Sequence, residues 1–430
     1  MKKIYLFIIS LIVFLLPTKI LAVDVSSPNA ILIEMESGKV LYEKEANTLV
    51  YPASTTKILT TILALENCEP EEKITASYDA IMSVPYDGST AAIQVGETFT
   101  VRQLIQAMMV CSANEAANMI AEHIGGNIES FSSMMNARAK ELGANSTHFL
   151  NANGLHEDSH QTTVHDMAII ARYGMQHFEE FRNAASLLEF SLPSTPFHEK
   201  EDRSFTNTNK LLISSSSYYY PYATGIKTGF TSKALNCIVA SANKDGVELI
   251  AVVFGSIDVQ NRTDDVKALF EYGFEKLKSV QFYEKGSIIE NVNVPGSAKE
   301  GSTVAAILTK DVIHTIPATK NASDYPPDIQ LLDKIKAPIS SGDSLGTVTY
   351  HIEGNSYQYE LVAAEDVESV IGNVAAVAVK TAKVIGKIIF WAVLSVVGIF
   401  IFFVFLRASV ISKRQRMRNR RRAIYNRRFR

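Results

Sequence analysis

Residues 388–406 form an uninterrupted apolar run without a single charged side chain. As an α-helix, these 19 residues would be about 28 Å long, enough to cross the hydrocarbon core of a bilayer. Residues 407–430 then carry 11 Lys and Arg residues and no acid, and Lys380, Lys383 and Lys387 lie before the run. Because the more basic flank stays in the cytoplasm, the sequence predicts a single-pass cell-membrane protein with a cytoplasmic tail.

The N-terminus is typical of an exported chain. Lys2 and Lys3 precede an apolar stretch that ends at Ala22, which predicts a signal peptide over residues 1–22. The net charge is −3, but without the tail 31 basic residues face 45 acidic ones, a net −14 for residues 1–406. The exported part is therefore acidic. The Arg-rich tail is predicted to bind anionic lipid and no nucleic acid, since it adjoins a membrane span.

Three short motifs occur in the exported part: Ser54-Thr-Thr-Lys57, Ser112-Ala-Asn114 and Lys227-Thr-Gly229. Ser54 and Lys57 begin an apolar segment, residues 55–65, that is predicted to be helical, so both side chains would rise from one face. A lysine accepts a serine proton only when it is neutral. Burial beside a second cation lowers a lysine pKa, and Lys227 is a candidate for that cation. The pair indicates a nucleophilic serine and its base.

The other two motifs are expected on a turn and on a strand. Ser112-Ala-Asn114 falls between two apolar segments of helical length. Lys227-Thr-Gly229 is predicted to start an edge strand, ahead of two strand-like runs joined by an Asp-Gly turn. Each motif alone is weak, because Ser-x-x-Lys occurs by chance and Ser54 could simply cap a helix. The occurrence of all three motifs in this order makes the prediction of an active-site serine enzyme specific.

The chain resembles the D-alanyl-D-alanine carboxypeptidases, low-molecular-mass penicillin-binding proteins of serine peptidase type. Matching stretches recur over residues 26–275 and include Pro52-Ala-Ser-Thr-Thr-Lys57, Ser112-Ala-Asn-Glu-Ala-Ala117, Thr147-His-Phe149, Asn153-Gly-Leu155 and Gly225-Ile-Lys-Thr-Gly-Phe-Thr231. The resemblance implies removal of the terminal D-alanine from peptidoglycan stem pentapeptides, with β-lactam antibiotics as inhibitors. It implies no cofactor and no metal ion.

The resemblance also implies residue roles in catalysis. Ser54 would attack the carbonyl of the penultimate D-alanine and form an acyl-enzyme, and Lys57 would accept the hydroxyl proton. Ser112 would relay a proton toward the leaving amine, and Asn114 would hold the substrate amide. Water would then hydrolyse the ester, whereas an acceptor amine would make the reaction a transpeptidation.

A second group of residues is implied in substrate binding. Lys227 and Thr228 would bind the terminal carboxylate, because a cation and a hydroxyl complement a negative charge. Gly229 would let the strand approach the substrate, and the backbone N–H of Phe230 would share the oxyanion hole with that of the nucleophile. Arg262 would lie near the carboxylate. Its alternative interpretation is a surface ion pair at a helix start.

The fold class implied is α/β, a serine β-lactamase/DD-peptidase-like antiparallel sheet flanked by helices, predicted for the catalytic domain at residues 23–278. Residues 279–366 alternate apolar and polar side chains between Pro-, Gly- and Asp-rich turns, which predicts a small β-domain. Residues 367–387, rich in Ala, Val and Gly, are predicted to be a linker into the transmembrane helix at residues 388–406.

Three other functions share parts of this pattern. A β-lactamase has the same motifs, but the β-domain, the membrane span and Ser-Ala-Asn make it less favoured. A catalytically inactive, membrane-tethered penicillin-binding scaffold would have no reason to keep the motif residues intact. An esterase of the same fold would cleave neutral esters without needing Lys227 for a carboxylate.

Cysteines and histidines suggest no additional chemistry. Three cysteines allow at most one disulfide within the chain, and Cys111 and Cys237 are predicted to be buried small apolar residues. His156, His160 and His165 fall in a loop rich in Asn, Gly, Ser and Thr, so they do not share a helical face, and no zinc site is predicted there.

Overall fold

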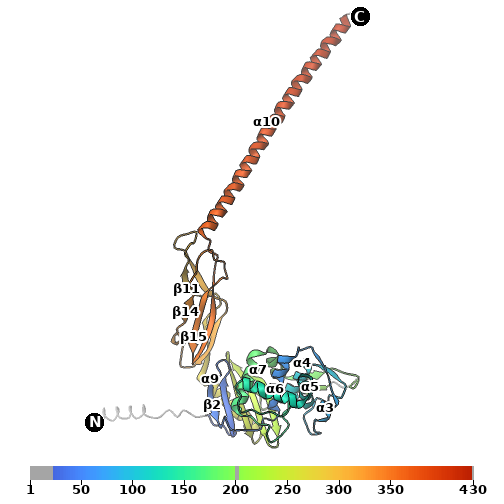
Figure 1. Cartoon of the computed structure of the whole chain (residues 1–430), viewed down its shortest axis with the longest axis vertical. Coiled ribbons are helices and arrows are strands. Elements are labelled where there is room, and N and C mark those ends of the chain that lie inside the picture. Colours follow the sequence, from blue (N-terminus) through green and yellow to red (C-terminus); the bar gives the residue numbers. More distant parts are fainter. Residues whose placement is uncertain (1–22, 199–202, 429–430) are drawn as a thin grey trace, which may run out of the picture. The chain divides into compact units, whose positions relative to one another are not determined.

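The computed structural model describes residues 23–198 and 203–428, so the predicted signal peptide, residues 1–22, lies outside the described residues (Figure 1). The chain divides into two compact units. The first comprises the chain up to Phe282 together with the segments Ile313–Tyr325 and Ile352–Asn355. The second comprises Tyr283–Val312, Pro326–His351 and Ser356–Arg430.

The first unit is built on a five-stranded sheet. Its strands are β2 (Val40–Lys44), β1 (Asn29–Glu34), β9 (Val247–Ser256), β8 (Leu235–Lys244) and β7 (Ala223–Thr231), in that spatial order. Every neighbouring pair is antiparallel. The predicted antiparallel sheet is therefore confirmed, with two N-terminal strands added beside three from later in the chain.

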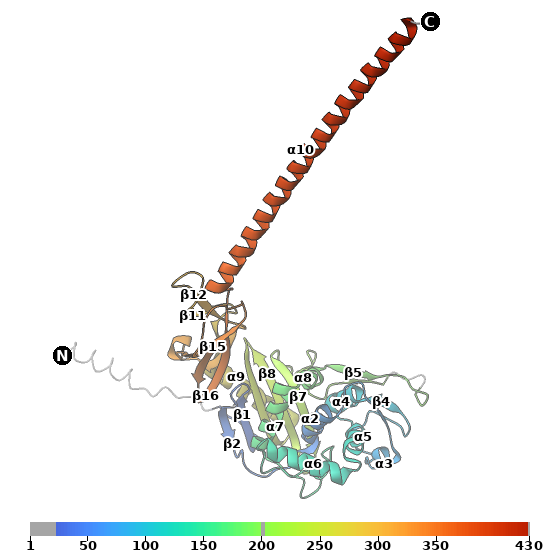
Figure 2. The same cartoon turned by 45° about the horizontal axis from the view of Figure 1, so that its top comes forward.

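Both faces of this sheet are apolar because side chains alternate along each strand. In β9, Ile250 and Val252 face the larger core, whereas Ala251 and Val253 face a second core. Helix α9 (Val259–Lys276) covers the second face, packing on β9, β8 and β1. Figure 2 shows β7 and β8 between α9 on one side and the other helices on the opposite side.

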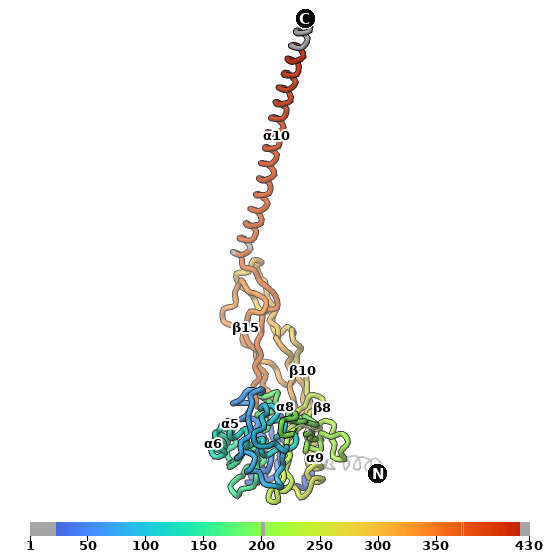
Figure 3. Tube along the Cα trace, turned by 90° about the vertical axis from the view of Figure 1, so that its right-hand side faces the viewer, coloured from blue at the N-terminus to red at the C-terminus, as the bar shows by residue number. Residues whose placement is uncertain are grey.

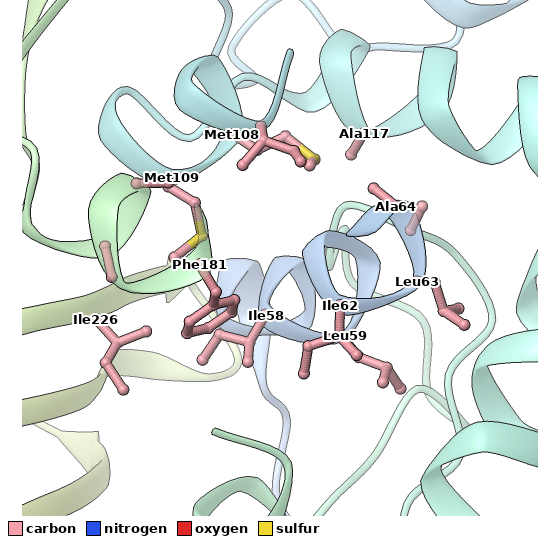
Figure 4. Packing of buried hydrophobic residues seen from close by; sticks show 14 of the residues in the cluster. Ile58, Leu59, Ile62, Leu63, Ala64, Met108, Met109, Ala117, Phe181 and Ile226 are labelled. Carbon is pink, nitrogen blue, oxygen red and sulfur yellow. The ribbon is translucent and has the colours of Figure 1, made fainter. Parts of the chain in front are cut away.

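Most helices cover the larger core: α2 (Lys57–Asn67), α4 (Val101–Val110), α5 (Asn114–Gly125), α6 (Ile128–Glu141), α7 (Val164–His177) and α8 (Glu179–Ser186). Helix α2 is central. Its first eight residues are all buried, which is the pattern of a helix surrounded by protein. Ile58 lies near Phe181 of α8 and Ile226 of β7, while Met108 of α4 and Ala117 of α5 line the other side (Figure 4).

Short elements complete the first unit: η1 (Ala53–Thr56), β3 (Lys73–Thr75), α3 (Tyr78–Met82), β4 (Thr98–Thr100), β5 (Glu189–Leu192) and β6 (Arg203–Thr206). Strand β3 pairs with β4, and β5 pairs with β6. In this arrangement η1 lies directly before α2 and contacts β7, so the start of the central helix adjoins the edge strand of the sheet.

The region after α9 is rich in strands, as the alternating sequence predicted. A second five-stranded sheet has the order β11 (Ile288–Asn293), β12 (Thr303–Leu308), β16 (Asn355–Ala363), β15 (Ser344–Ile352) and β14 (Asp328–Leu331). Strands β10 (Leu277–Tyr283) and β13 (Val312–Pro317) pair with each other, and the short helix η2 (Ala322–Asp324) follows β13. The predicted small β-domain is confirmed as an element of the fold.

The C-terminal helix α10 (Val370–Arg428) is continuous (Figures 1 and 3). It contains the predicted span, and residues 370–387, which the sequence predicted to be a linker, are its first turns. Ala- and Val-rich segments have no helix-breaking proline, which is consistent with this extension. By length and composition the helix is apolar enough to cross a membrane.

Candidate active site

Ser54 and Lys57 meet at the start of α2. Ser54 lies in η1, and Lys57 is the first residue of α2. The turn is tight: Ala53 has a φ of 48°, and the Thr56 hydroxyl donates to the Ala53 carbonyl at 2.8 Å. Lys57 Nζ lies 3.1 Å from Ser54 Oγ. The structure thus brings together the two side chains that the spacing of the motif placed on one face.

Lys57 is completely buried, and its amine has two further partners. Nζ donates to Asn114 Oδ1 at 2.7 Å and to the Asn153 carbonyl at 2.6 Å. Burial, and then the charge of Lys227, hold the pKa of Lys57 well below its ordinary value. A neutral amine has two N–H groups and one lone pair. With both N–H groups committed to the two Asn oxygens, the lone pair is left for the hydroxyl of Ser54.

Ser112 and Asn114 occupy the turn between α4 and α5. Ser112 is 5% exposed. Its φ of 65° lies in the left-handed region, which residues other than glycine rarely adopt. Asn114 begins α5, and its backbone N–H donates to the Ser89 carbonyl at 2.9 Å. Strained backbone of this kind is concentrated at functional sites. Both side chains line the same cleft because this turn, and not the spacing of residues along a helix, sets their positions.

Lys227, Thr228 and Gly229 lie in the second half of β7, so the prediction that they start an edge strand was wrong about position but right about the edge. Lys227 is 1% exposed, and its Nζ donates to the Thr228 carbonyl at 3.0 Å. Burial lowers the pKa of Lys227 to about 7, partly offset by Cys111. The Thr228 hydroxyl donates to that of Thr208 at 2.8 Å.

Gly229 sets how closely β7 approaches the turn that carries Ser54. A Cβ at this position would lie 3.0 Å from both the Pro52 carbonyl oxygen and the Ser54 nitrogen. Glycine is therefore required by the close packing of the strand against the turn. The next residue, Phe230, has a side chain 64% exposed, so its backbone is the part held in the sheet, opposite Asn236.

Arg262 is buried on α9. It is 5% exposed, and Nη1 donates to the Cys237 carbonyl at 3.3 Å. Burial lowers the pKa of its guanidinium, with Cys237 acting in the opposite sense. The alternative of a surface ion pair is therefore wrong, because the helix-start position faces the sheet instead of solvent.

A cleft of ≈ 760 Å³ joins these residues. Seven of the predicted site residues line it: Ser54, Ser112, Asn114, Thr228, Gly229, Phe230 and Arg262. Lys57 and Lys227 are buried beside it. Sequence reasoning assigned no site role to several other lining residues, among them Asp87, His156, Thr208 and Lys210. They come from loops without a periodic pattern, although the Asn153-Gly-Leu155 stretch singled out by the resemblance marked the rim that holds Lys57.

The three histidines of residues 156–165 have separate surroundings. His156 packs edge-on against Tyr51, His165 lies beside Asp166, and His160 is 2% exposed. The Leu150 N–H donates to Nδ1 of His160 at 2.9 Å, so Nε2 carries the proton that faces the Thr56 hydroxyl, also at 2.9 Å. Burial lowers the pKa of His160 to about 3, which keeps it neutral. His160 thus ties the turn of the nucleophile to the loop that supplies the Asn153 carbonyl.

Replacing His160 with alanine is expected to lower the acylation rate by about 10-fold with little change in KM, because the turn and the loop lose their common support. His160→Gln, which can still bridge the two groups, should recover part of the loss. Stopped-flow labelling with a fluorescent penicillin measures both. His165→Ala, at a 38% exposed side chain, is the matched control. Equal rates for His160→Ala and wild type would remove this positioning role.

The cysteines are free thiols: Cys237 is fully buried in β8, whereas Cys68 and Cys111 are half-buried. The prediction for Cys237 as a buried small side chain is confirmed. The prediction that Cys111 is buried was only partly right, because this residue, in the turn before Ser112, is half-buried at the edge of the core.

The three motifs converge as they do in penicillin-binding proteins and class A β-lactamases. The sequence profile of peptidase family S11, described as D-alanyl-D-alanine carboxypeptidase, matches residues 17–257, and the penicillin-binding protein 5 C-terminal domain matches residues 277–369. The chain belongs to the D-alanyl-D-alanine carboxypeptidase family.

Individual relatives agree with this assignment. D-alanyl-D-alanine carboxypeptidase DacF from Bacillus subtilis is 32% identical over 348 residues, covering 79% of this chain and 85% of the relative. The crystal structure of penicillin-binding protein 5 from Haemophilus influenzae superposes with a TM-score of 0.58 at 26% identity, covering 80% of this chain and 98% of that one. The structure of PBP3 from Streptococcus pneumoniae shares the fold, with a TM-score of 0.66 at 23% identity, covering 80% of this chain and 100% of that one.

Proposed function

We propose that this enzyme removes the terminal D-alanine from peptidoglycan stem pentapeptides through an acyl-enzyme on Ser54. The family is that of D-alanyl-D-alanine carboxypeptidases, serine peptidases that act on peptidoglycan and bind penicillin. The observation that carries the assignment of Ser54 is the geometry of Lys57: a buried amine that donates to Asn114 Oδ1 and to the Asn153 carbonyl and lies 3.1 Å from the Ser54 hydroxyl, whose proton it can accept when it is neutral.

In the acylation step, Ser54 Oγ forms a bond to the carbonyl carbon of the penultimate D-alanine as its proton passes to Lys57 Nζ. The developing oxyanion is stabilised by the backbone N–H groups of Ser54 and Phe230, which Gly229 allows to lie close together. Ser112 relays a proton to the departing amine, and the C–N bond breaks. Water then attacks the ester carbonyl and gives a proton to Lys57, which passes it to Ser54 Oγ as the ester bond breaks. This step releases the shortened peptide and regenerates the Ser54 hydroxyl.

The substrate carboxylate is assigned to the end of the cleft near Thr228 and Arg262. Arg262 supplies a permanent charge and Thr228 a hydroxyl at the cleft wall, and the buried Lys227 adds a second cation beside them. Asn114 also lines the cleft, where its amide N–H binds the peptide while Oδ1 accepts a hydrogen bond from Lys57. This division explains why a free C-terminal carboxylate is recognised next to the scissile bond.

The membrane arrangement is also a proposal. Helix α10 is long and apolar enough to span a bilayer, and its basic end favours the cytoplasm. The catalytic domain, residues 23–278, and the β-domain, residues 279–366, would then lie outside, where peptidoglycan is. The match of the two family profiles to residues 17–257 and 277–369 supports that division.

The test uses the full-length chain in detergent micelles. Incubation with benzylpenicillin should give a covalent adduct, located by peptide mapping on Ser54, and a pentapeptide ending in D-Ala-D-Ala should release D-alanine. Rapid antibiotic turnover without peptide cleavage would favour the β-lactamase. If neither an adduct nor released D-alanine is found, the inactive penicillin-binding scaffold is the favoured interpretation.

Lys227→Ala is expected to lower kcat/KM for the carboxylate-ending pentapeptide by about 10- to 100-fold, mainly through KM, because a charge-assisted interaction is lost. The same peptide ending in an amide should lose much less, because for that substrate only the smaller effect of the Lys227 charge on the pKa of Lys57 is removed. Lys233→Ala, at an exposed lysine just after β7, is the control. Equal losses on acid and amide would contradict carboxylate recognition by Lys227, whereas a neutral ester that wild type and Lys227→Ala cleave equally well would favour the esterase.

A further inference from the structure

Three metal-ligating side chains meet at the far end of α2 from the nucleophile. Cys68 Sγ, a carboxylate oxygen of Glu72 and an imidazole nitrogen of His123 all lie within 4.8 Å of one another. His123 Nε2 is 2.7 Å from Glu72 Oε1. Lys57 starts α2 and Cys68 follows its last residue, so the cluster lies about 16 Å along the helix from the catalytic lysine. It is separate from the cleft.

The backbone that carries these side chains is well anchored. The Cys68 N–H caps α2 by donating to the Ala64 carbonyl at 3.0 Å. The Glu72 N–H closes a turn on the Glu69 carbonyl at 3.0 Å. His123 lies in the last turn of α5, which ends in the left-handed residue Gly126. Two segments, the connection between α2 and β3 and the last turn of α5, therefore supply the three ligands.

We infer that Cys68, Glu72 and His123 form a surface site for a zinc ion, or for another borderline divalent transition metal. Zinc takes thiolate, imidazole and carboxylate ligands at about 2.0–2.3 Å, which places tetrahedral ligand atoms about 3.3–3.8 Å apart. The side chains need move by roughly 1 Å to reach that spacing, within the reach of ordinary rotamer adjustment.

The ligand set also selects the class of ion. A thiolate disfavours Mg²⁺ and Ca²⁺, which take oxygen ligands, whereas Cys with His and a carboxylate suits zinc. The side chains of Glu72 and His123 are 39% and 33% exposed, so the ion enters from solvent and the fourth position is open to water. On binding, the thiol proton passes to solvent and the hydrogen bond between His123 and Glu72 gives way to two metal bonds.

Equilibrium dialysis of the reduced full-length chain in detergent, against zinc in excess Mg²⁺, tests this site. We expect one zinc ion per chain, and at least about a 10-fold loss of affinity in Cys68→Ser and in His123→Gln. His165→Gln, another exposed histidine beside a carboxylate but without a thiol, is the matched control and should bind as wild type does. Cobalt should give a thiolate charge-transfer band that Cys68→Ser lacks.

Two outcomes would overturn the site. If Cys68→Ser binds zinc as well as wild type does, the thiol is not a ligand. If wild type binds no zinc, His123 and Glu72 form an ordinary surface ion pair beside a free thiol. Penicillin labelling of Cys68→Ser and His123→Gln should match wild type in either case, which shows that both variants are folded and separates this test from that of the peptidase activity.

Discussion

Replacing Lys57 with methionine is expected to slow acylation by benzylpenicillin by about 10³-fold or more, because the side chain keeps its volume but loses the base that accepts the Ser54 proton. General-base catalysis alone contributes about 10²- to 10⁴-fold. Removing a buried amine also leaves Asn114 Oδ1 and the Asn153 carbonyl without their donor, so thermal stability should be measured beside activity. Stopped-flow penicillin labelling gives the rate.

Lys73→Met is the matched control, because Lys73 is exposed in β3 and lies outside the cleft. It should label at the wild-type rate. Acylation of Lys57→Met within a few-fold of wild type, in a chain shown by thermal melting to be folded, would contradict the role of Lys57 as the base and would require another group to take the proton.

Lys57 and Lys227 together determine how activity is expected to depend on pH. Lys57 acts when neutral, and because its pKa is held well below the ordinary value, activity should rise with pH through that lowered pKa. Lys227 acts when charged, and its pKa is lowered to about 7, so carboxylate binding should weaken as pH rises through about 7. The expected profile of kcat/KM is bell-shaped, with the alkaline fall seen in KM. Lys227→Ala should lack that fall, and an alkaline fall retained by this variant would assign it elsewhere.

Gly154→Ala is expected to destabilise the protein by about 3–5 kcal/mol and to abolish penicillin labelling. Gly154 has a φ of 85°, and a Cβ there would lie 1.9 Å from the Ala53 carbonyl oxygen and 2.9 Å from the Ser54 nitrogen. Both are backbone atoms, so the turn that carries the nucleophile must move. Chemical denaturation and labelling measure the two effects.

Gly126→Ala is the control that separates the backbone strain of a left-handed residue from the steric clash of an added Cβ. Gly126 has a φ of 76°, but nothing lies within 4 Å of a Cβ built on it. It therefore bears only the left-handed backbone penalty, about 1–2 kcal/mol, and should label normally. If the two alanine variants were equally stable and equally active, the close packing of the Gly154 loop against the Ser54 turn would not be required.

Several parts of this protein were predictable because they are set by local geometry. Side chains three residues apart in a helical turn lie on one face, which is why Ser54 and Lys57 were correctly paired. Two apolar runs on either side of an Asp-Gly turn predicted the strands β8 and β9 together with their turn. The length of the apolar run near the C-terminus, with the rise per residue of a helix, predicted a helix long and apolar enough to span a membrane.

The remaining features depend on packing between distant segments. The Asn153 carbonyl that fixes the Lys57 amine is 96 residues away in the chain, and nothing periodic in its loop marks it. The burial of Arg262, the support of the nucleophile turn by His160 and the meeting of Cys68 with His123 have the same origin. The sequence thus determined which residues are candidates for the chemistry and which segment is apolar enough to enter a bilayer, because both follow from residue type and backbone period. Only the tertiary structure decided the protonation and the aim of the lysines, because those depend on which loops exclude water and supply the partners.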